Sequence, residues 1–240
     1  MKIAIDLGHG CGKDRGAVGA IKEEKIINEV GIKVVEKLKA AGHEVLQVRP
    51  SGNLDVSQSL AYRVNLANSN NSDLYVSIHA NAGRGQGCEV YTYKGKELTE
   101  GRRVLNNICS LGFKNRGIKN ANLYVVNNTK MAAMLIEVCF VDTQSDVNLY
   151  NSVGADKIAT AIVNGINGGI KTSASTTTEL PYKVKVTATA LNVREEPNTR
   201  AHITAVVRAG EVYTITGTRN NWGKLKSGAG WICLNYVKKV

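Results

Sequence analysis

Residues 4–28 read AIDLGHGCGKDRGAVGAIKEEKIIN, a short apolar segment, a glycine-rich loop and the start of an amphipathic segment. The apolar residues before Gly8 are typical of a buried strand. After the loop, apolar residues recur at helical spacing, namely Ile27, Val30, Val34 and Leu38. This spacing predicts a helix over residues 23–41, which Gly42 ends. A strand followed directly by a helix is the first unit of an α/β fold.

The same alternation continues along the chain. Strands are predicted at residues 3–7, 44–48, 74–79, 88–93 and 133–138. Helices are predicted at residues 23–41, 57–68, 98–111 and 155–166. Alternation of this kind predicts an α/β domain, with a twisted, mostly parallel sheet flanked by helices on both faces.

The composition changes sharply at KTSASTTTELP, residues 171–181, a Ser/Thr-rich run closed by proline that is typical of a linker. Beyond it, short alternating segments are punctuated by Gly, Pro and Asn, which predicts a small all-β barrel. The predicted organisation is therefore an α/β domain over residues 1–170, a linker over residues 171–181, and a barrel over residues 182–240.

Positive charge is concentrated in the last quarter of the chain. The net charge is +11, and residues 180–240 hold ten Lys/Arg against three Asp/Glu. A basic surface indicates a polyanionic partner, such as nucleic acid, anionic lipid or an acidic cell wall. Charge by itself does not choose among these partners, and a solvated basic face is the ordinary alternative.

The sequence offers no run of about 18 apolar residues, so no membrane span is predicted. The apolar segment after Met1 is too short for a signal-peptide core, which predicts synthesis in the cytoplasm without export by the general secretory route. The five cysteines are odd in number and match no CxxC metal-binding pattern. Free thiols are therefore predicted.

Chemistry-bearing side chains are predicted to gather at the carboxyl ends of the strands, where α/β sheets place their functional groups. His9, His79 and Glu137 each lie at a predicted strand end, and Glu24 lies in the first turn of the following helix. Two histidines and one carboxylate form a known ligand set for catalytic zinc. Glu137 interrupts the apolar run AAMLIEV, where a buried carboxylate without a partner is costly.

Each residue taken alone has an ordinary explanation. A histidine at a strand end is usually a polar loop residue, and Glu24 would interact favourably with the N-terminal end of a helix. Only Glu137 favours a functional interpretation by itself, because of its apolar surroundings in the sequence.

Four motifs in order, GHGCGKDRGAVG, EKIIN, SIHAN and IEVCFV, resemble the zinc-dependent N-acetylmuramoyl-L-alanine amidases of the type-3 family. The resemblance covers about residues 1–170. It implies a Zn2+ ion held by His9, Glu24 and His79, with Glu137 as the catalytic glutamate. Members of that family hydrolyse the amide between the lactyl group of N-acetylmuramic acid and L-alanine. Glu23 adjoins Glu24, and helical neighbours point about 100° apart, so only one can face the metal; the EKIIN match favours Glu24.

The C-terminal segments LNVREEP and GWICLNYV resemble bacterial SH3-like domains that bind cell walls. The resemblance implies a groove of aromatic and polar residues, for which the candidates are Tyr213, Trp222, Trp231 and Tyr236. A place in the barrel core is the alternative, above all for Trp231.

Together these features predict an enzyme that degrades peptidoglycan, an endolysin of a bacteriophage that lyses its host. The alternatives are a host autolysin and a catalytically inactive protein that binds the cell wall. A nucleic-acid-binding protein would rest on charge alone, and no motif supports it. The sequence does not predict an oligomeric state.

Overall fold

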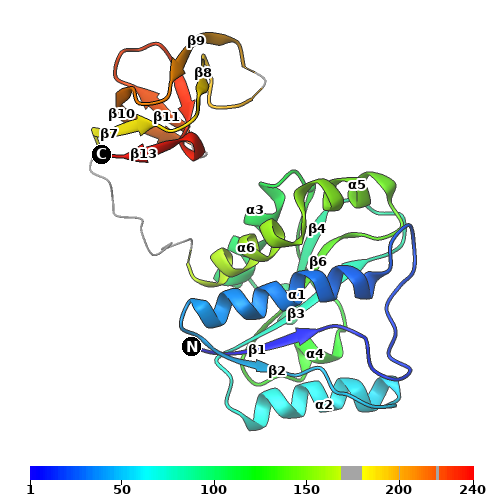
Figure 1. The fold of residues 1–240 in the computed structure, drawn as a ribbon. Helices are drawn as coiled ribbons and strands as arrows, with labels where there is room; N and C mark the ends of the chain where they lie inside the picture. Colours follow the sequence, from blue (N-terminus) through cyan, green and yellow to red (C-terminus); the bar gives the residue numbers. More distant parts are fainter. Residues whose placement is uncertain (169–179, 200, 220–221) are drawn as a thin grey trace. The chain divides into compact units, whose positions relative to one another are not determined.

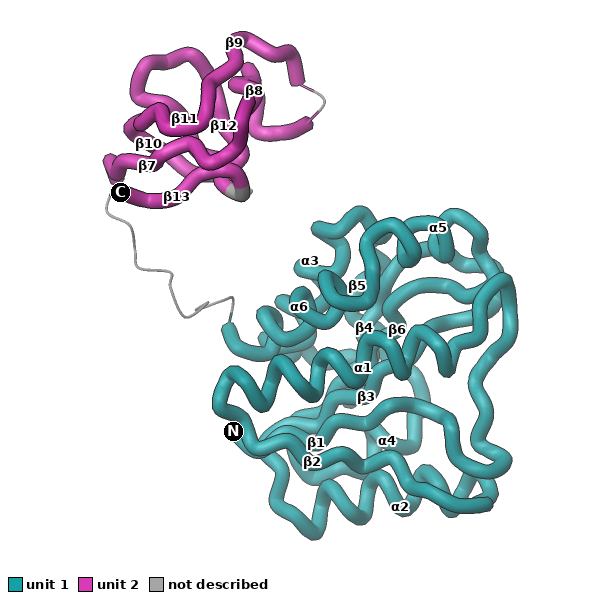
Figure 2. Tube along the Cα trace, viewed as in Figure 1, with its two compact units in different colours: residues 1–171 teal, residues 172–240 magenta. Residues whose placement is uncertain are grey.

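Residues 1–168, 180–199, 201–219 and 222–240 are described in the computed structural model of the chain. They belong to two units, Met1–Lys171 and Thr172–Val240 (Figure 2). Most of the predicted linker, residues 171–179, lies outside the described residues.

A six-stranded sheet forms the centre of the first unit (Figure 1). Its strands are β1 (Lys2–Leu7), β2 (Glu44–Gln47), β3 (Leu74–Asn81), β4 (Cys88–Thr92), β5 (Asn115–Lys119) and β6 (Ala132–Phe140). They lie in the order β2-β1-β3-β6-β4-β5. Only the β4–β6 pair is antiparallel among these neighbours. The mostly parallel α/β sheet predicted from the alternation is confirmed.

Helices cover both faces of this sheet. They are α1 (Glu23–Ala40), α2 (Val56–Ser69), α3 (Thr99–Cys109), α4 (Tyr124–Asn127), α5 (Gln144–Val153) and α6 (Ala155–Ile166). The larger hydrophobic cluster joins one sheet face to α1, α3 and α6, and the smaller one joins the other face to α2 and α4. Three elements were not predicted: β5, α4 and α5. The first two are short, and β5 is a partly exposed edge strand with the sequence NRGIK, which lacks an apolar alternation.

The side-chain alternation of the strands explains where polar groups gather. In β1, Ile3, Ile5 and Leu7 face the larger cluster, while Ala4 faces the smaller one and Asp6 takes the next position on that side. The other central strands follow the same pattern and become polar toward their carboxyl ends. Helices α2 and α4 pack against the apolar positions of this face.

The second unit contains a seven-stranded sheet in the order β13-β7-β10-β11-β12-β8-β9. The strands are β7 (Tyr182–Val186), β8 (Ala190–Arg194), β9 (Ile203–Arg208), β10 (Val212–Arg219), β11 (Trp222–Leu225), β12 (Trp231–Cys233) and β13 (Val237–Lys239). All paired neighbours are antiparallel, which confirms the predicted all-β class. Trp222 is buried in this unit, whereas Tyr236 is 51% exposed.

Across the described residues, no helix combines the length and apolar character that crossing a membrane requires. All five cysteines are free, as predicted.

Candidate metal and catalytic site

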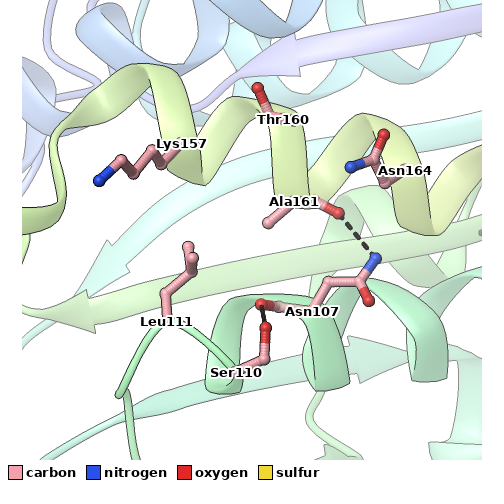
Figure 3. A pocket seen from close by; sticks show the side chains of 7 residues that line it. All are labelled: Asn107, Ser110, Leu111, Lys157, Thr160, Ala161 and Asn164. Atoms are coloured by element: carbon pink, nitrogen blue, oxygen red, sulfur yellow. Dashed lines mark hydrogen bonds between the residues drawn. The ribbon is translucent and has the colours of Figure 1, made fainter. Parts of the chain in front are cut away.

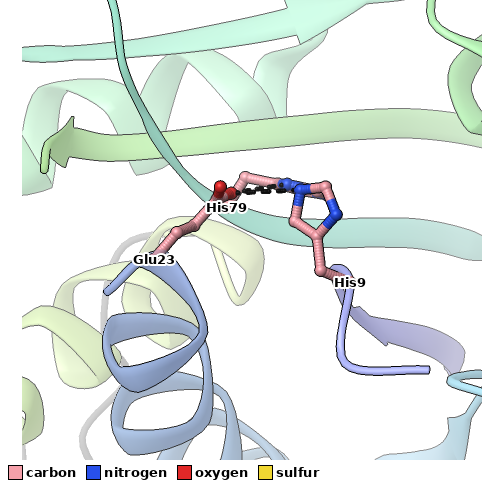
Figure 4. A group of neighbouring side chains, drawn as sticks. All are labelled: His9, Glu23 and His79. Atoms are coloured by element: carbon pink, nitrogen blue, oxygen red, sulfur yellow. Dashed lines mark hydrogen bonds and ion pairs between the residues drawn. The ribbon is translucent and has the colours of Figure 1, made fainter. Parts of the chain in front are cut away.

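Side chains from three separate segments meet at the carboxyl-end edge of the first sheet (Figure 4). His9 follows β1, Glu23 begins α1 and His79 lies in β3. The Glu23 Oε1 atom lies 3.0 Å from His79 Nδ1 and 3.4 Å from His9 Nε2. The two imidazole centroids are 4.8 Å apart with their planes at 81°. Donor atoms of all three side chains lie within 4.8 Å of one another, close enough to share one cation.

The carboxylate of this cluster belongs to Glu23, whereas the motif match predicted Glu24. Glu24 points elsewhere: it accepts a hydrogen bond from Arg15 Nη2 at 2.7 Å and one from the backbone N–H of Gly16 at 3.3 Å. Glu23 is 4% exposed and precedes Ile27 by one helical turn, on the apolar face of α1 that packs against the sheet. Packing of the helix therefore directs Glu23 toward the histidines, and the expected position of Glu24 is corrected.

The backbone around His9 adopts a conformation that few residues tolerate. His9 has a φ of +53°, in the left-handed region. Arg63 Nη2 donates to the His9 carbonyl at 2.9 Å, and Arg49 Nη2 donates to the Gly8 carbonyl at 2.8 Å. Gly8 is required because a Cβ atom there would lie 2.2 Å from His79 Nε2. Two buried or half-buried arginines thus hold the loop that presents His9.

Charge in the cluster is balanced by protons when no cation is bound. Burial disfavours the imidazolium of His9, but hydrogen bonds and attraction from Glu23 and Asp14 outweigh it and raise the pKa of His9 to about 8. Burial also opposes ionisation of Glu23, yet hydrogen bonds with His79 and His9 hold the pKa of its carboxyl well below its usual range. A divalent cation would take the place of the proton.

A network of buried hydrogen bonds orients the His9 ring through its Nδ1 atom, which faces away from Glu23. This Nδ1 lies 2.7 Å from Asp14 Oδ1. The other Asp14 oxygen accepts hydrogen bonds from Ser59 Oγ at 2.8 Å and from Arg63 Nη2 at 3.2 Å. A carboxylate on Nδ1 fixes the ring and leaves Nε2 directed at Glu23, as in many metal-binding histidines.

Arg63 connects this network to β1. Its side chain is 1% exposed, and its Nη1 donates to Asp6 Oδ1 and, at 2.9 Å, to the Leu7 carbonyl. The second Asp6 oxygen accepts from the hydroxyls of Tyr75 at 2.8 Å and Ser77 at 2.7 Å. Both oxygens of this buried carboxylate therefore have partners.

Glu137 lies beside the cluster on the next strand. In the sheet it is directly opposite His79 of β3 and Glu89 of β4, and such partners point to the same side about 5 Å apart. Its Oε2 is buried and has no hydrogen-bond partner among the described residues. Burial raises the pKa of Glu137 to about 7. An unpaired oxygen with a pKa near neutrality is suited to accept and return a proton.

The residues present fit a catalytic zinc ion. Two imidazole nitrogens and one carboxylate oxygen converge, and this donor set leaves a coordination position for water or substrate. The unpaired Glu137 oxygen lies on the same side of the sheet as these donors. Cys11 does not join the set, because its thiol donates to the Gly52 carbonyl at 3.3 Å.

A separate cavity of about 410 Å³ lies between α3 and α6 (Figure 3). Asn107 Nδ2 donates across it to the Ala161 carbonyl at 3.1 Å. Of the described residues that line it, Lys157 is the one with a charged side chain, and none is a histidine, aspartate or glutamate. This cavity therefore lacks the acid–base groups that the edge of the sheet provides.

Sequence reasoning missed Asp6, Asp14 and Arg63. Asp6 interrupts an apolar strand just as Glu137 does, so the same signal was present. Arg63 gave no comparable signal, because an arginine in an amphipathic helix is normally exposed.

Comparison with known families gives matches to both units. A family described as N-acetylmuramoyl-L-alanine amidase matches residues 3–168, and one described as bacterial SH3 domain matches residues 189–238. The sporulation-specific N-acetylmuramoyl-L-alanine amidase of Bacillus subtilis is 33% identical, over 78% of this chain and 75% of its own length. The endolysin of Bacillus phage SPP1 is 36% identical, over 61% of this chain and 57% of its own length.

Among solved structures, the catalytic domain of the CD27L endolysin, described as targeting Clostridia difficile, is similar with a TM-score of 0.64 and 30% identity. The similarity covers 70% of this chain and 98% of that domain. The chain spans about half the length, 52% and 51%, of two Clostridium perfringens proteins to which it is 38% and 37% identical.

Proposed function

The chain belongs to the N-acetylmuramoyl-L-alanine amidase family, and from this premise we propose that it hydrolyses the amide between the lactyl group of N-acetylmuramic acid and L-alanine in peptidoglycan. One observation carries the proposal: His9, Glu23 and His79 converge beside the unpaired oxygen of Glu137. Amide hydrolysis at a metal site needs such a ligand set and a free base.

Zinc is the cofactor that we assign to this site, with His9, Glu23 and His79 as its ligands. When bound, the ion supplies Lewis acidity, which polarises a carbonyl group and makes water more acidic. The protein orients the ligands in advance: backbone N–H groups of Ala17 and Ala80 donate to the two Glu23 oxygens at 2.8 and 3.2 Å. Asp14 fixes the ring of His9 in the same way.

Glu137 acts as the general base and then as the general acid. Its free Oε2 accepts a proton from the attacking water, and the same carboxyl returns the proton to the leaving amine of L-alanine. A pKa of about 7 is suited to both transfers near neutral pH.

The second unit is proposed to hold the enzyme on the cell wall. The bacterial SH3 match covers residues 189–238, and the residues from 180 onward carry ten cations against three anions. Tyr236 is 51% exposed and therefore available to a wall polymer, whereas Lys224 Nζ lies over the Trp231 ring, 6.0 Å from its centroid. Binding to the wall raises the local concentration of the scissile bond.

We assign the lytic role of an endolysin to the chain, synthesised in the host cytoplasm and acting on the wall after release. Two similar proteins are named endolysins, the protein of phage SPP1 and the CD27L domain. An autolysin of the host would perform the same chemistry.

Mass spectrometry of digested peptidoglycan tests the proposed reaction. New free L-alanine amino groups and intact glycan strands are expected, and a zinc chelator should abolish their appearance. Cleavage within the glycan or at a peptide bond, or lysis that resists the chelator, would overturn the proposal. Wall binding without any cleavage would identify an inactive binding protein instead.

A further inference from the structure

A second buried carboxylate lies next to Glu137, on the side away from the metal ligands. Glu89 of β4 is 2% exposed and directly opposite Glu137. Its Oε1 accepts hydrogen bonds from Asn81 Nδ2 at 2.7 Å and Tyr91 OH at 2.9 Å, and its Oε2 accepts one from Arg116 Nε at 2.6 Å. Because both oxygens are engaged, Glu89 serves to fix the donors around it.

Arg116 is the cation that this carboxylate positions. The guanidinium carbon lies 4.8 Å from the ring centroid of Phe140, which is itself 3% exposed. Salt bridge and ring together fix the orientation of the guanidinium plane. No described residue forms a hydrogen bond with its terminal nitrogens Nη1 and Nη2, and the side chain is 29% exposed. A fixed guanidinium with free N–H groups is suited to bind a carboxylate through two hydrogen bonds.

Lys119 adds to the positive charge at this end of the sheet. Its Nζ lies 3.9 Å from Glu89 Oε2, and its side chain is 40% exposed. Arg116 and Lys119 together offset the charge of Glu89, and both attract anionic groups of a substrate.

The sheet order sets the distance from this charge to the reaction. Strands β3, β6, β4 and β5 are consecutive and carry His79, Glu137, Glu89 and Arg116. Neighbouring strands lie about 4.8 Å apart. The backbone of Arg116 is therefore about 10 Å from that of Glu137 and about 14 Å from that of His79. An extended peptide spans about 3.5 Å per residue. A peptide that leaves the metal along this row therefore reaches Arg116 two to four residues beyond the scissile amide.

We propose that Arg116 binds a free carboxylate of the stem peptide, two to four residues from the scissile amide, and that Lys119 strengthens this attraction. The inference rests on the proposed function, because the stem peptide is the part of the substrate that extends from the cleaved bond. It makes Arg116 a specificity-determining residue that favours peptides with a free carboxylate over those with a carboxamide.

The test uses the full chain and pairs of muramoyl peptides that differ only in a carboxylate or a carboxamide at those positions. The wild type should prefer the carboxylate in kcat/KM by about 10- to 100-fold, the range for a charge-assisted hydrogen bond. In Arg116→Gln this ratio should fall to about threefold or less, mainly through a higher KM. Arg103→Gln is the matched control: Arg103 is 31% exposed, pairs with Glu100 at 3.1 Å and lies in α3. It should keep the wild-type ratio.

A wild-type enzyme that cleaves both peptides equally, or an Arg116→Gln enzyme with the wild-type ratio, would overturn the inference. If Arg116→Gln does not fold, the exposed Lys119→Gln replaces it, and a ratio reduced about threefold is expected; an unchanged ratio would count against the subsite. If the wild type cleaves neither peptide, the proposed function fails. Calorimetric titration of the free stem peptides then decides separately, because only the carboxylate form should bind, and equal binding of both forms would refute the subsite.

Discussion

The regions around Asp6 and Glu137 share a face of the same sheet, yet their carboxylates differ in how many hydrogen-bond partners they have. Asp6 accepts hydrogen bonds from Arg63, Tyr75 and Ser77, and it is 1% exposed. Glu137 lies two strands away in β6, with a buried oxygen that no described residue contacts by a hydrogen bond. Desolvation is therefore compensated in the first region and remains uncompensated in the second.

This difference separates structural groups from reactive ones. A buried carboxylate with every oxygen engaged cannot take up a proton without breaking its partners' hydrogen bonds. A carboxylate with a free oxygen costs stability but retains the capacity for proton transfer. A substitution that removes a partner of Asp6 should therefore lower stability. A substitution of Glu137 should instead lower activity and raise stability.

The largest effect is expected for Glu137→Gln. Turnover should fall about 10²- to 10⁴-fold, the usual contribution of general acid–base catalysis, while zinc content stays at the wild-type level. Peptidoglycan cleavage together with elemental analysis measures both. Turnover close to that of the wild type would refute the role of Glu137 as base.

Arg63→Met should lower the free energy of unfolding by about 3–5 kcal/mol, because it leaves Asp6 and Asp14 buried without their cation. Arg15→Met is the control: Arg15 is 62% exposed and pairs with Glu24, so the expected change is below about 1 kcal/mol. Urea unfolding measures both variants, and equal losses would contradict the comparison.

In the metal-free protein, Glu137→Gln should increase stability, and the gain should depend on pH. The pKa of Glu137 is raised from 4.5 to about 7 in the fold. Its protonated form therefore favours the fold at acid pH, and this contribution is lost as pH rises through about 7. The gain from glutamine should be near zero below pH 4.5 and reach up to about 3 kcal/mol above pH 7. Thermal unfolding at pH 4 and pH 8 tests this, and a pH-independent difference would argue against it.

Glu23→Gln should weaken zinc binding at least about 100-fold, whereas Glu24→Gln should change it by less than about threefold. The physical reason is that only Glu23 contacts the two imidazoles, and Glu24 pairs with Arg15. Competition with a zinc-sensitive chelating dye measures both affinities. If Glu24→Gln lost more zinc affinity than Glu23→Gln, Glu24 would be the ligand, as the EKIIN motif predicted.

The smallest effect is expected for Asp14→Asn, which should weaken zinc binding about 10- to 100-fold. Asp14 contacts His9 Nδ1 at 2.7 Å, so its loss frees the ring without removing a ligand. The same dye competition applies, with Ser59→Ala, which removes one of the hydrogen bonds to Asp14, as the milder comparison. An affinity equal to the wild type would exclude this orienting role.

Most of the fold could be predicted from the sequence, because apolar residues recur at regular spacing in the central strands and the long helices. The missed elements lack this spacing: β5 is NRGIK, and α4 has four residues. The site was readable where residues break such a period, as Glu137 does. The helical spacing also indicated Glu23 rather than Glu24. The apolar residues Ile27, Val30, Val34 and Leu38 lie 4, 7, 11 and 15 positions after residue 23, which places Glu23 on the same face of the helix.

The sequence by itself determined the α/β class, the all-β C-terminal segment and the residue types of the candidate metal site, because period and composition are local properties of the chain. Only the tertiary structure decided that Asp6, Asp14 and Arg63 support the histidines, and that Arg116 lies in the same row as Glu137. Those relations depend on strand order and helix packing, which bring together residues as distant in the chain as Asp6 and Arg63, 57 positions apart, and no local pattern encodes them.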